Sequence, residues 1–267
     1  MNIKRIYAVF IRQVYLVRDN FPRFVQMFVW TTVDIILWGF ISKYVGGVAG
    51  SNLDFVPLFL GAVLLWDLLI QIMQGISMSF FEDMWSQNFL NIFASPMRIS
   101  EYITGLVVTS LARGAIVLVG MLFLATFAFG FSVFIYGASL TLFLAILILF
   151  GIALGIFGIS IVLRLGSSAE WFIWPIPALI SPFVGVVYPI STLPQWMQYV
   201  GKFLPPSYVF TGVRSLVHGE GLSVTTLIGG IVLSFFYIML AYSVFIMVYR
   251  RGIRSGRIAR YSAEGVG

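Results

Sequence analysis

The sequence predicts an all-α integral membrane protein with six transmembrane helices. Hydrophobic residues make up 60% of its 267 residues and charged residues only 10%, whereas soluble domains carry about 25% charged residues. The apolar residues also gather in segments of about 20 or more, the length that a helix needs to cross a bilayer. We therefore expect one membrane domain over residues 1–267, in which lipid is the solvent for most side chains.

Residues 1–22 are expected to form an amphipathic helix that lies in the membrane interface. Apolar side chains such as Ile3 and Phe10 recur at helical spacing, while Lys4 falls on a different face. Pro22 interrupts this pattern before the first apolar segment. The alternative is a plain basic flank in front of the first transmembrane helix.

Six apolar segments are expected to cross the bilayer, and each has about the length of a transmembrane helix. They cover residues 24–44, 56–79, 102–129, 137–163, 171–189 and 223–249. The fifth is unusual because it holds several prolines, which remove backbone hydrogen bonds that lipid cannot replace. We therefore expect the fifth helix to be kinked and enclosed by the others.

A polar segment, residues 80–98, separates the second and third apolar segments. It is expected to form an amphipathic helix outside the bilayer, with its two acids at the start, where the helix dipole favours negative charge. Aromatic residues would line one side of this helix, and a Ser-Pro pair would end it. The residues that define it are Glu82, Asp83, Trp85, Phe89 and Pro96.

Residues 190–219 predict two short helices, since neither of the two pieces is long enough to cross a bilayer. Pro194 and the pair Pro205-Pro206 stand where helices commonly begin, and Gly219 stands where the second one would end. We expect this segment to dip into the membrane and return to the same side.

Lysine and arginine residues predict that both termini lie in the cytoplasm, because basic residues are enriched in cytoplasmic loops. With that orientation the cytoplasmic side holds Lys4, Arg5, Arg12, Arg18, Arg23, Arg98, Arg164, Arg250, Arg251, Arg254, Arg257 and Arg260. The outer side holds only Lys43, Lys202 and Arg214. This places residues 80–98 and a basic tail, residues 250–267, in the cytoplasm and residues 190–219 outside. Topology explains the net charge of +6, so no nucleic-acid partner is expected.

Three charged residues fall inside apolar segments, namely Asp34, Asp67 and Arg113. A charge at that depth costs at least about 2.5–3.5 kcal/mol. Either Arg113 pairs with one of the acids and holds the first three helices together, or the acids contact substrate or protons in a cavity. Gln71 and Gln74 lie on the same helical stripe as Asp67, which indicates helix–helix hydrogen bonds or a transport pathway.

Taken in order, these features resemble a permease of the ABC-2 type exporter family over nearly the full length of the chain. The resemblance is carried by the N-terminal amphipathic helix, by an acidic segment that ends in Ser95-Pro96 and continues to Glu101, and by a proline-rich block. That block comprises Pro182, Gly185, Tyr188, Pro189, Pro194, Trp196, Pro205 and Arg214.

The resemblance implies a role for each of these segments. Residues 80–98 would be the coupling helix, whose defining residues contact an ATPase, and the proline-rich block would form an extracellular gate. The partners would be separate ABC ATPase subunits and a second permease, in a homodimer or a heterodimer. No cofactor is expected in this chain, which contains no phosphate-binding Gly-x-x-x-x-Gly-Lys motif, so the ATPase would bind ATP and magnesium.

The preferred interpretation is a permease, not itself an enzyme, that exports an amphipathic, drug-like or lipid-linked substrate across the cytoplasmic membrane of a prokaryote. One alternative is an ion- or proton-coupled transporter that uses Asp34 and Asp67. Another is an intramembrane enzyme, but the chain has no cysteine, and its single histidine, His218, lies in the expected outer segment. That inventory lacks an obvious nucleophile, acid–base pair or metal site.

Overall fold

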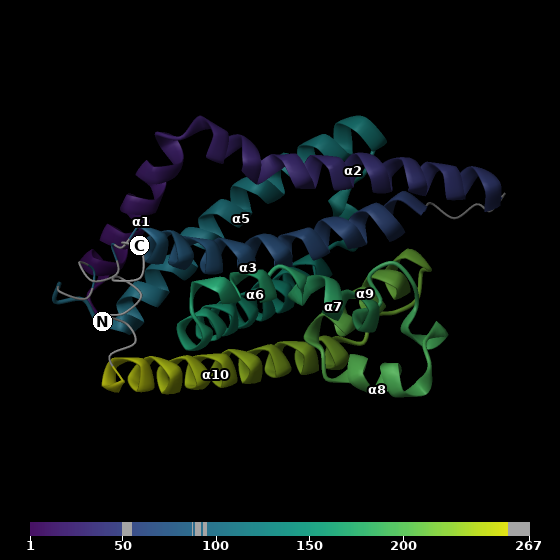
Figure 1. Ribbon diagram of the computed structural model, residues 1–267. Coiled ribbons are helices and arrows are strands. Elements are labelled where there is room, and N and C mark those ends of the chain that lie inside the picture. The colour runs from purple at the N-terminus through teal and green to yellow at the C-terminus, as the bar shows by residue number, and fades with distance from the viewer. Residues whose placement is uncertain (50–54, 87, 89–91, 93–94, 256–267) are drawn as a thin grey trace.

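The computed structural model describes residues 1–49, 55–86, 88, 92 and 95–255, and within them the chain is almost entirely helical, without β-strands. Five helices in this part are long and apolar enough to cross a membrane. The predicted all-α membrane fold is therefore confirmed. Figure 1 shows the long helices side by side, with the short helices of residues 175–217 gathered at one end.

The first, second, third, fourth and last of the predicted transmembrane segments each correspond to one long helix. The α-helices are α1 (Ile3–Arg18), α2 (Phe21–Ala49), α3 (Gly61–Trp85), α5 (Ile99–Phe129), α6 (Ser139–Leu165), α7 (Pro175–Val184), α8 (Gln195–Lys202), α9 (Pro205–Val217) and α10 (Val224–Arg254). A π-helix, η1 (Val56–Leu60), precedes α3, and short 3-10 helices are η2 (Val133–Tyr136), η3 (Ser167–Phe172) and η4 (Ile190–Thr192).

Helix α3 forms the centre of the bundle, because it packs against both α5 and α6 and buries most of its surface. Small residues of α6 make this close contact possible. A Cβ atom at Gly155 would lie 3.1 Å from the carbonyl oxygen of Met73, and the Ser77 hydroxyl donates to the Gly155 carbonyl at 3.2 Å. Close backbone approach at small residues is how helices associate in lipid, where apolar burial gives little driving force between them.

The end of α3 differs from the sequence prediction. The helix continues to Trp85, so Glu82 and Asp83 occupy its last turns and do not begin a separate helix. The prediction that the two acids benefit from a helix N-terminus is therefore wrong. Phe89 lies outside the described residues, whereas Pro96 lies in an exposed turn just before α5.

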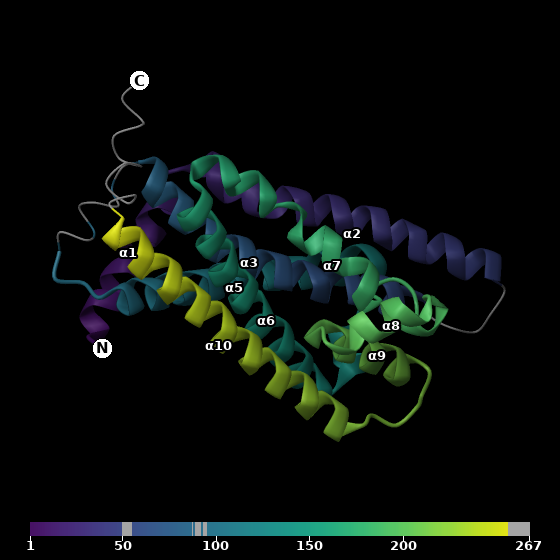
Figure 2. The same cartoon turned by 60° about the horizontal axis from the view of Figure 1, so that its bottom comes forward.

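The predicted fifth transmembrane helix is instead a pair of short helices, η3 and α7, separated by a break after Phe172. The apolar segment Ala169–Val184 would reach roughly 24 Å at about 1.5 Å per residue, less than the hydrocarbon thickness of about 30 Å. Proline accounts for the break, since Pro175 begins α7 and Pro182 lies inside it. Figure 2 shows this segment returning the chain along the bundle toward α8 and α9.

Helices α8 and α9 lie at the opposite end of the bundle from α1 and from the last turn of α10 (Figures 1 and 2). They contain 8 and 13 residues, so neither is long enough to cross a bilayer, as the sequence predicts. Pro205 occupies the first turn of α9, where its missing N–H costs no hydrogen bond. The chain therefore has two distinct ends, one built around α1 and the other around α7, α8 and α9.

Candidate functional site

A cavity of about 750 Å³ lies between α2, α3, α5 and the segment of η3 and Trp174. It brings together all five intramembrane residues that the sequence singles out. The polar residues that line it are Thr31, Asp34, Asp67, Gln71, Gln74, Glu82, Arg113 and Glu170. The fold therefore gathers polar groups from separate helices around one hollow.

The intramembrane charges do not form the expected ion pair. The described residues form ion pairs at Arg5–Glu101 and Arg12–Asp83, whereas Arg113 forms none with Asp34 or Asp67 within 4.0 Å. The alternative interpretation, in which these groups line a cavity, matches the geometry. Asp67 is only 7% exposed, and its Oδ2 atom is buried without a hydrogen-bond partner.

The two glutamines on the α3 stripe have different surroundings. The Gln71 side-chain amide donates to the Thr31 hydroxyl at 3.2 Å and to the Met27 carbonyl at 3.4 Å, so it links α3 to α2. Gln74 lines the cavity one turn further along the helix. Gln71 thus combines both roles that the sequence left open, a helix–helix hydrogen bond and a place in the cavity wall.

Two acidic cavity residues were missed by the sequence reasoning. Glu82 was assigned to the coupling helix and Glu170 to a polar loop, yet both line the cavity. A signal for Glu82 exists, because it continues the helical stripe from Asp67 through Gln74 if α3 is extended to Trp85. No such signal exists for Glu170, because its place depends on how η3 packs against α6.

A second polar cluster joins α1, α3 and α5 at one end of the bundle. Asp83, in the last turn of α3, is 2% exposed and forms an ion pair with Arg12 of α1. It also accepts a hydrogen bond from the Tyr102 hydroxyl of α5 at 2.6 Å. Asp83 therefore holds three helices together and does not present its charge to a partner protein.

Glu101, which follows residues 80–98 in α5, connects α5 to the start of α1. Its carboxylate accepts from the Asn2 backbone N–H at 2.7 Å and from the Arg5 guanidinium at 3.2 Å. It also accepts from the Arg98 N–H at 3.0 Å, which caps the first turn of α5. Both flanks of the segment are thus attached to α1.

Of the residues that define the expected coupling segment, Trp85 and Pro96 are exposed. Asp83 is turned inward, toward the cluster that it forms with Arg12 and Tyr102, here called the α1 cluster. Glu82 is turned toward the cavity. Of the residues expected to contact an ATPase, only Trp85 and Pro96 are therefore accessible in the part of the chain that the structure describes.

At the opposite end, Arg214 of α9 joins α9 to the end of α7. Its guanidinium donates to the carbonyl oxygens of Phe210, at 3.1 Å, and Val186, at 3.2 Å, and also to that of Gly185. Gly185 adopts φ +69°, the left-handed conformation that ends α7. Burial lowers the pKa of Arg214 to about 10, which leaves the side chain charged at neutral pH.

The other residues of the proline-rich block lie around this contact. The Tyr188 hydroxyl donates to the Pro182 carbonyl at 2.9 Å, and the Trp196 ring packs edge-on against that of Phe183. Pro189, Pro194 and Pro205 stand at the starts of η4, α8 and α9. The predicted gate residues thus belong to one structural unit at one end of the bundle.

Replacing Gly201 by alanine is expected to lower the stability of this unit. The added Cβ would lie 2.6 Å from the Phe183 carbonyl oxygen, a backbone atom that no rotamer change can move. We expect a loss of about 1–3 kcal/mol, measured as a lower midpoint of thermal unfolding in detergent. Gly221→Ala is the control, since no atom lies within 4 Å of its added carbon. Equal midpoints for the two variants would contradict this assignment.

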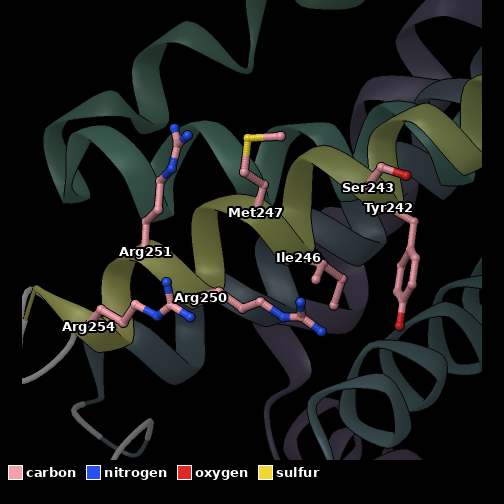
Figure 3. Close-up of a pocket in the computed structure, with 7 residues that line it drawn as sticks. All are labelled: Tyr242, Ser243, Ile246, Met247, Arg250, Arg251 and Arg254. Atoms are coloured by element: carbon pink, nitrogen blue, oxygen red, sulfur yellow. The ribbon is translucent and has the colours of Figure 1, made fainter.

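A third feature is a basic hollow of about 540 Å³ on the last turns of α10. Figure 3 shows Arg251 and Met247 on one side of the helix and Arg250 and Tyr242 on the other. Arginines at the end of a transmembrane helix commonly reach into the headgroup region. This hollow therefore fits a helix end at the membrane surface better than an enzymatic site.

No group of three His, Asp or Glu side chains that could hold a metal ion occurs within the described ranges. The chain is similar to a known family of transporters over most of its length. A family model described as ABC-2 type transporter matches residues 6–218, which is more than half of the chain. The matched region begins in α1 and ends just after α9, so it includes both polar ends and the cavity. A search among curated proteins found no match.

Proposed function

The chain belongs to the ABC-2 type transporter family and is the membrane permease of an ABC transporter, and on this basis we propose that it exports an amphipathic substrate, drug-like or lipid-linked. Separate ATPase subunits supply the energy, as the family implies. They bind ATP and magnesium, and this chain supplies the pathway. A second permease, identical or different, completes the complex.

One observation carries this proposal: a single rigid helix connects the α1 cluster to the cavity. Helix α3 runs unbroken for 25 residues, with Asp83 in the α1 cluster and Asp67 in the cavity wall. Because backbone hydrogen bonds make a buried helix stiff along its axis, displacement of one end moves the other. Closure of an ATPase dimer against α1 and residues 80–98 would thus change the shape of the cavity.

The orientation that we propose places α1 and the end of α10 in the cytoplasm of a prokaryotic cell. The basic residues support it, because they are concentrated at this end of the bundle and scarce around α8 and α9. The broken segment of η3 and α7 then makes the fifth of six crossings, and residues 190–219 form a re-entrant unit on the outer side. Arg250, Arg251 and Arg254 of the predicted basic tail lie in the last turns of α10, on this cytoplasmic side.

Replacing residues 87–94 with a Gly-Ser linker of the same length tests the role of the coupling segment. This change spares Asp83 and Glu101, so the bundle is expected to remain folded, while association with the ATPase is expected to be lost. The measurement is co-purification with ABC ATPases of the source organism, together with ATP-dependent transport in proteoliposomes. A variant with residues 219–222 replaced in the same way is the control. Normal ATPase binding by the linker variant would sink the proposed mechanism.

A second candidate function is ion- or proton-coupled transport through Asp34 and Asp67. It is favoured by the buried Oδ2 atom of Asp67, which has no hydrogen-bond partner and could exchange a proton or cation. Proteoliposomes separate the two functions, because the secondary transporter works under a pH gradient without an ATPase. Transport that depends on ATP and persists without a gradient supports the exporter.

A further inference from the structure

We propose that the cavity of α2, α3, α5 and η3 selects lipophilic organic cations. This inference rests on the proposed function, since it names the substrate class of the same site. It discriminates among the substrates that the family assignment leaves open. Three independent features of the cavity support it: the excess of acids in its wall, the buried Asp67 oxygen without a hydrogen-bond partner, and the aromatic and methionine side chains that line it.

The charge of the cavity wall favours a positive ligand. Among the described residues that line it are four carboxyl groups, those of Asp34, Asp67, Glu82 and Glu170, and one guanidinium, that of Arg113. Charges interact more strongly where protein and lipid exclude water, so the excess of acids attracts cations and repels anions. Lipid carriers with a phosphate or pyrophosphate group would therefore be disfavoured.

Asp67 has a buried carboxyl oxygen that no group of the described residues binds, and a cationic ligand could bind it. Its side chain is more than nine-tenths buried and lines the cavity, and the Oδ2 atom makes no hydrogen bond. Burial of a carboxylate is unfavourable unless another group compensates it, and no arginine or lysine of the described residues forms an ion pair with Asp67 within 4.0 Å. A bound cation would supply the compensation that the protein lacks.

Aromatic and thioether side chains complete the cavity wall. Three tryptophans, Trp30, Trp171 and Trp174, line it, and the face of an indole ring attracts cations. Met27 and Met78 add flexible apolar surface that adapts to ligands of different shape. The volume of about 750 Å³ lies within the range of about 300–1,000 Å³ that is usual for drug-sized ligands.

A sugar headgroup fits this wall less well than a lipophilic cation. Sugars require a dense set of free hydrogen-bonding groups, whereas the Gln71 amide is already engaged with Thr31 and Met27. Apart from its charged groups and Gln74, the rest of the wall is aromatic and apolar. The combination of buried acid, indole faces and methionines points to a cation with a large apolar body.

A pair of probes of nearly equal size and opposite charge tests this inference. The purified full-length chain in nanodiscs is titrated with tetraphenylphosphonium, a cation, and with tetraphenylborate, an anion, and binding is followed by equilibrium dialysis. We expect the cation to bind at least about 10-fold more tightly to the protein, after subtraction of binding to empty nanodiscs. Equal affinities, or tighter binding of the anion, would overturn the inference.

Variants of Asp67 identify the site. Asp67→Asn is expected to weaken tetraphenylphosphonium binding by about 10-fold and to leave tetraphenylborate binding no weaker, because only the cation loses a charged partner. Asp67→Glu keeps the charge and is expected to retain binding, which separates loss of charge from misfolding. Glu220→Gln, an exposed acid beside α9, is the control. Unchanged affinity in Asp67→Asn would overturn the site assignment.

These measurements use neither ATP nor an ATPase, so they fail separately from the proposed function. Selective cation binding without any ATPase association would contradict the ATP-driven mechanism but uphold the cation site. ATP-driven transport without cation selectivity would uphold the ATP-driven mechanism but contradict the cation site. The two sets of results thus bear on two different statements about the same cavity.

Discussion

Replacing Asp83 by alanine is expected to destabilise the permease by about 3 kcal/mol, at the lower end of the range for breaking a buried ion pair. Asp83 is almost fully buried and holds both Arg12 and the Tyr102 hydroxyl. Its removal leaves a guanidinium without its partner, although Arg12 keeps some access to solvent, which limits the cost. The measurement is the midpoint of thermal unfolding in detergent, compared with that of the wild type.

Two further variants make this prediction specific. Asp19→Ala removes an exposed acid from the connection between α1 and α2, and its unfolding midpoint is expected to stay near that of the wild type. The double variant Arg12→Met and Asp83→Leu is expected to lose less stability than the two single variants lose together, because it removes both charges at once. If Asp83→Ala unfolded at the wild-type temperature, the α1 cluster would not have the structural role assigned to it.

The same variant has an expected effect on transport. With Asp83 absent, α1 loses its ion pair to α3, while its main packing, against α5 and α2, is retained. We expect ATP-driven transport to fall more than stability does, since the push on α1 no longer reaches the cavity through α3. The double variant is informative here, because restored stability without restored transport would assign the pair to coupling.

Replacing Arg214 by alanine has the second large expected effect. Hydrogen bonds from a charged donor contribute about 1.5–3 kcal/mol, and Arg214 donates to carbonyl groups at the end of α7 and within α9. We expect the contact between α7 and α9 to loosen, and the backbone amides of α8 to exchange hydrogen faster. Hydrogen–deuterium exchange followed by mass spectrometry measures this directly.

A lysine at position 214 is expected to restore the contact only in part. A single ammonium group cannot reproduce the flat, multidentate geometry with which the guanidinium reaches Gly185, Val186 and Phe210. Lys202→Ala, an exposed cation on the neighbouring helix, serves as the control and should leave exchange in α8 nearly unchanged. Full protection of α8 in Arg214→Ala would show that the unit is held by other contacts.

Local patterns in the sequence were sufficient for most helices and for the choice of site residues. Runs of apolar residues predicted the long helices, prolines marked the starts of α8 and α9, and Gly219 marked the end of α9. The intramembrane acids, amides and arginine were chosen because polar groups are costly in lipid, and the structure places all of them around one cavity. These inferences succeeded because they depend on spacing and composition along one segment.

The errors arose where contacts between distant segments decide the outcome. Polarity suggested that Glu82 and Asp83 leave the second helix, but α3 continues because Asp83 meets Arg12, 71 residues earlier, and Tyr102. The expected pairing of Arg113 with an acid was equally reasonable from the sequence, yet the packing of α2, α3 and α5 keeps these charges apart around a hollow. No local pattern reports the distance between side chains on different helices.

The amino-acid sequence by itself determined that this chain is a helical membrane protein with polar groups in its transmembrane helices, because the cost of exposing backbone and charge to lipid acts residue by residue. Only the tertiary structure decided which polar groups stabilise the bundle and which are left to meet a substrate. That division depends on the geometry between helices, which gives Asp83 two partners and leaves an oxygen of Asp67 with none.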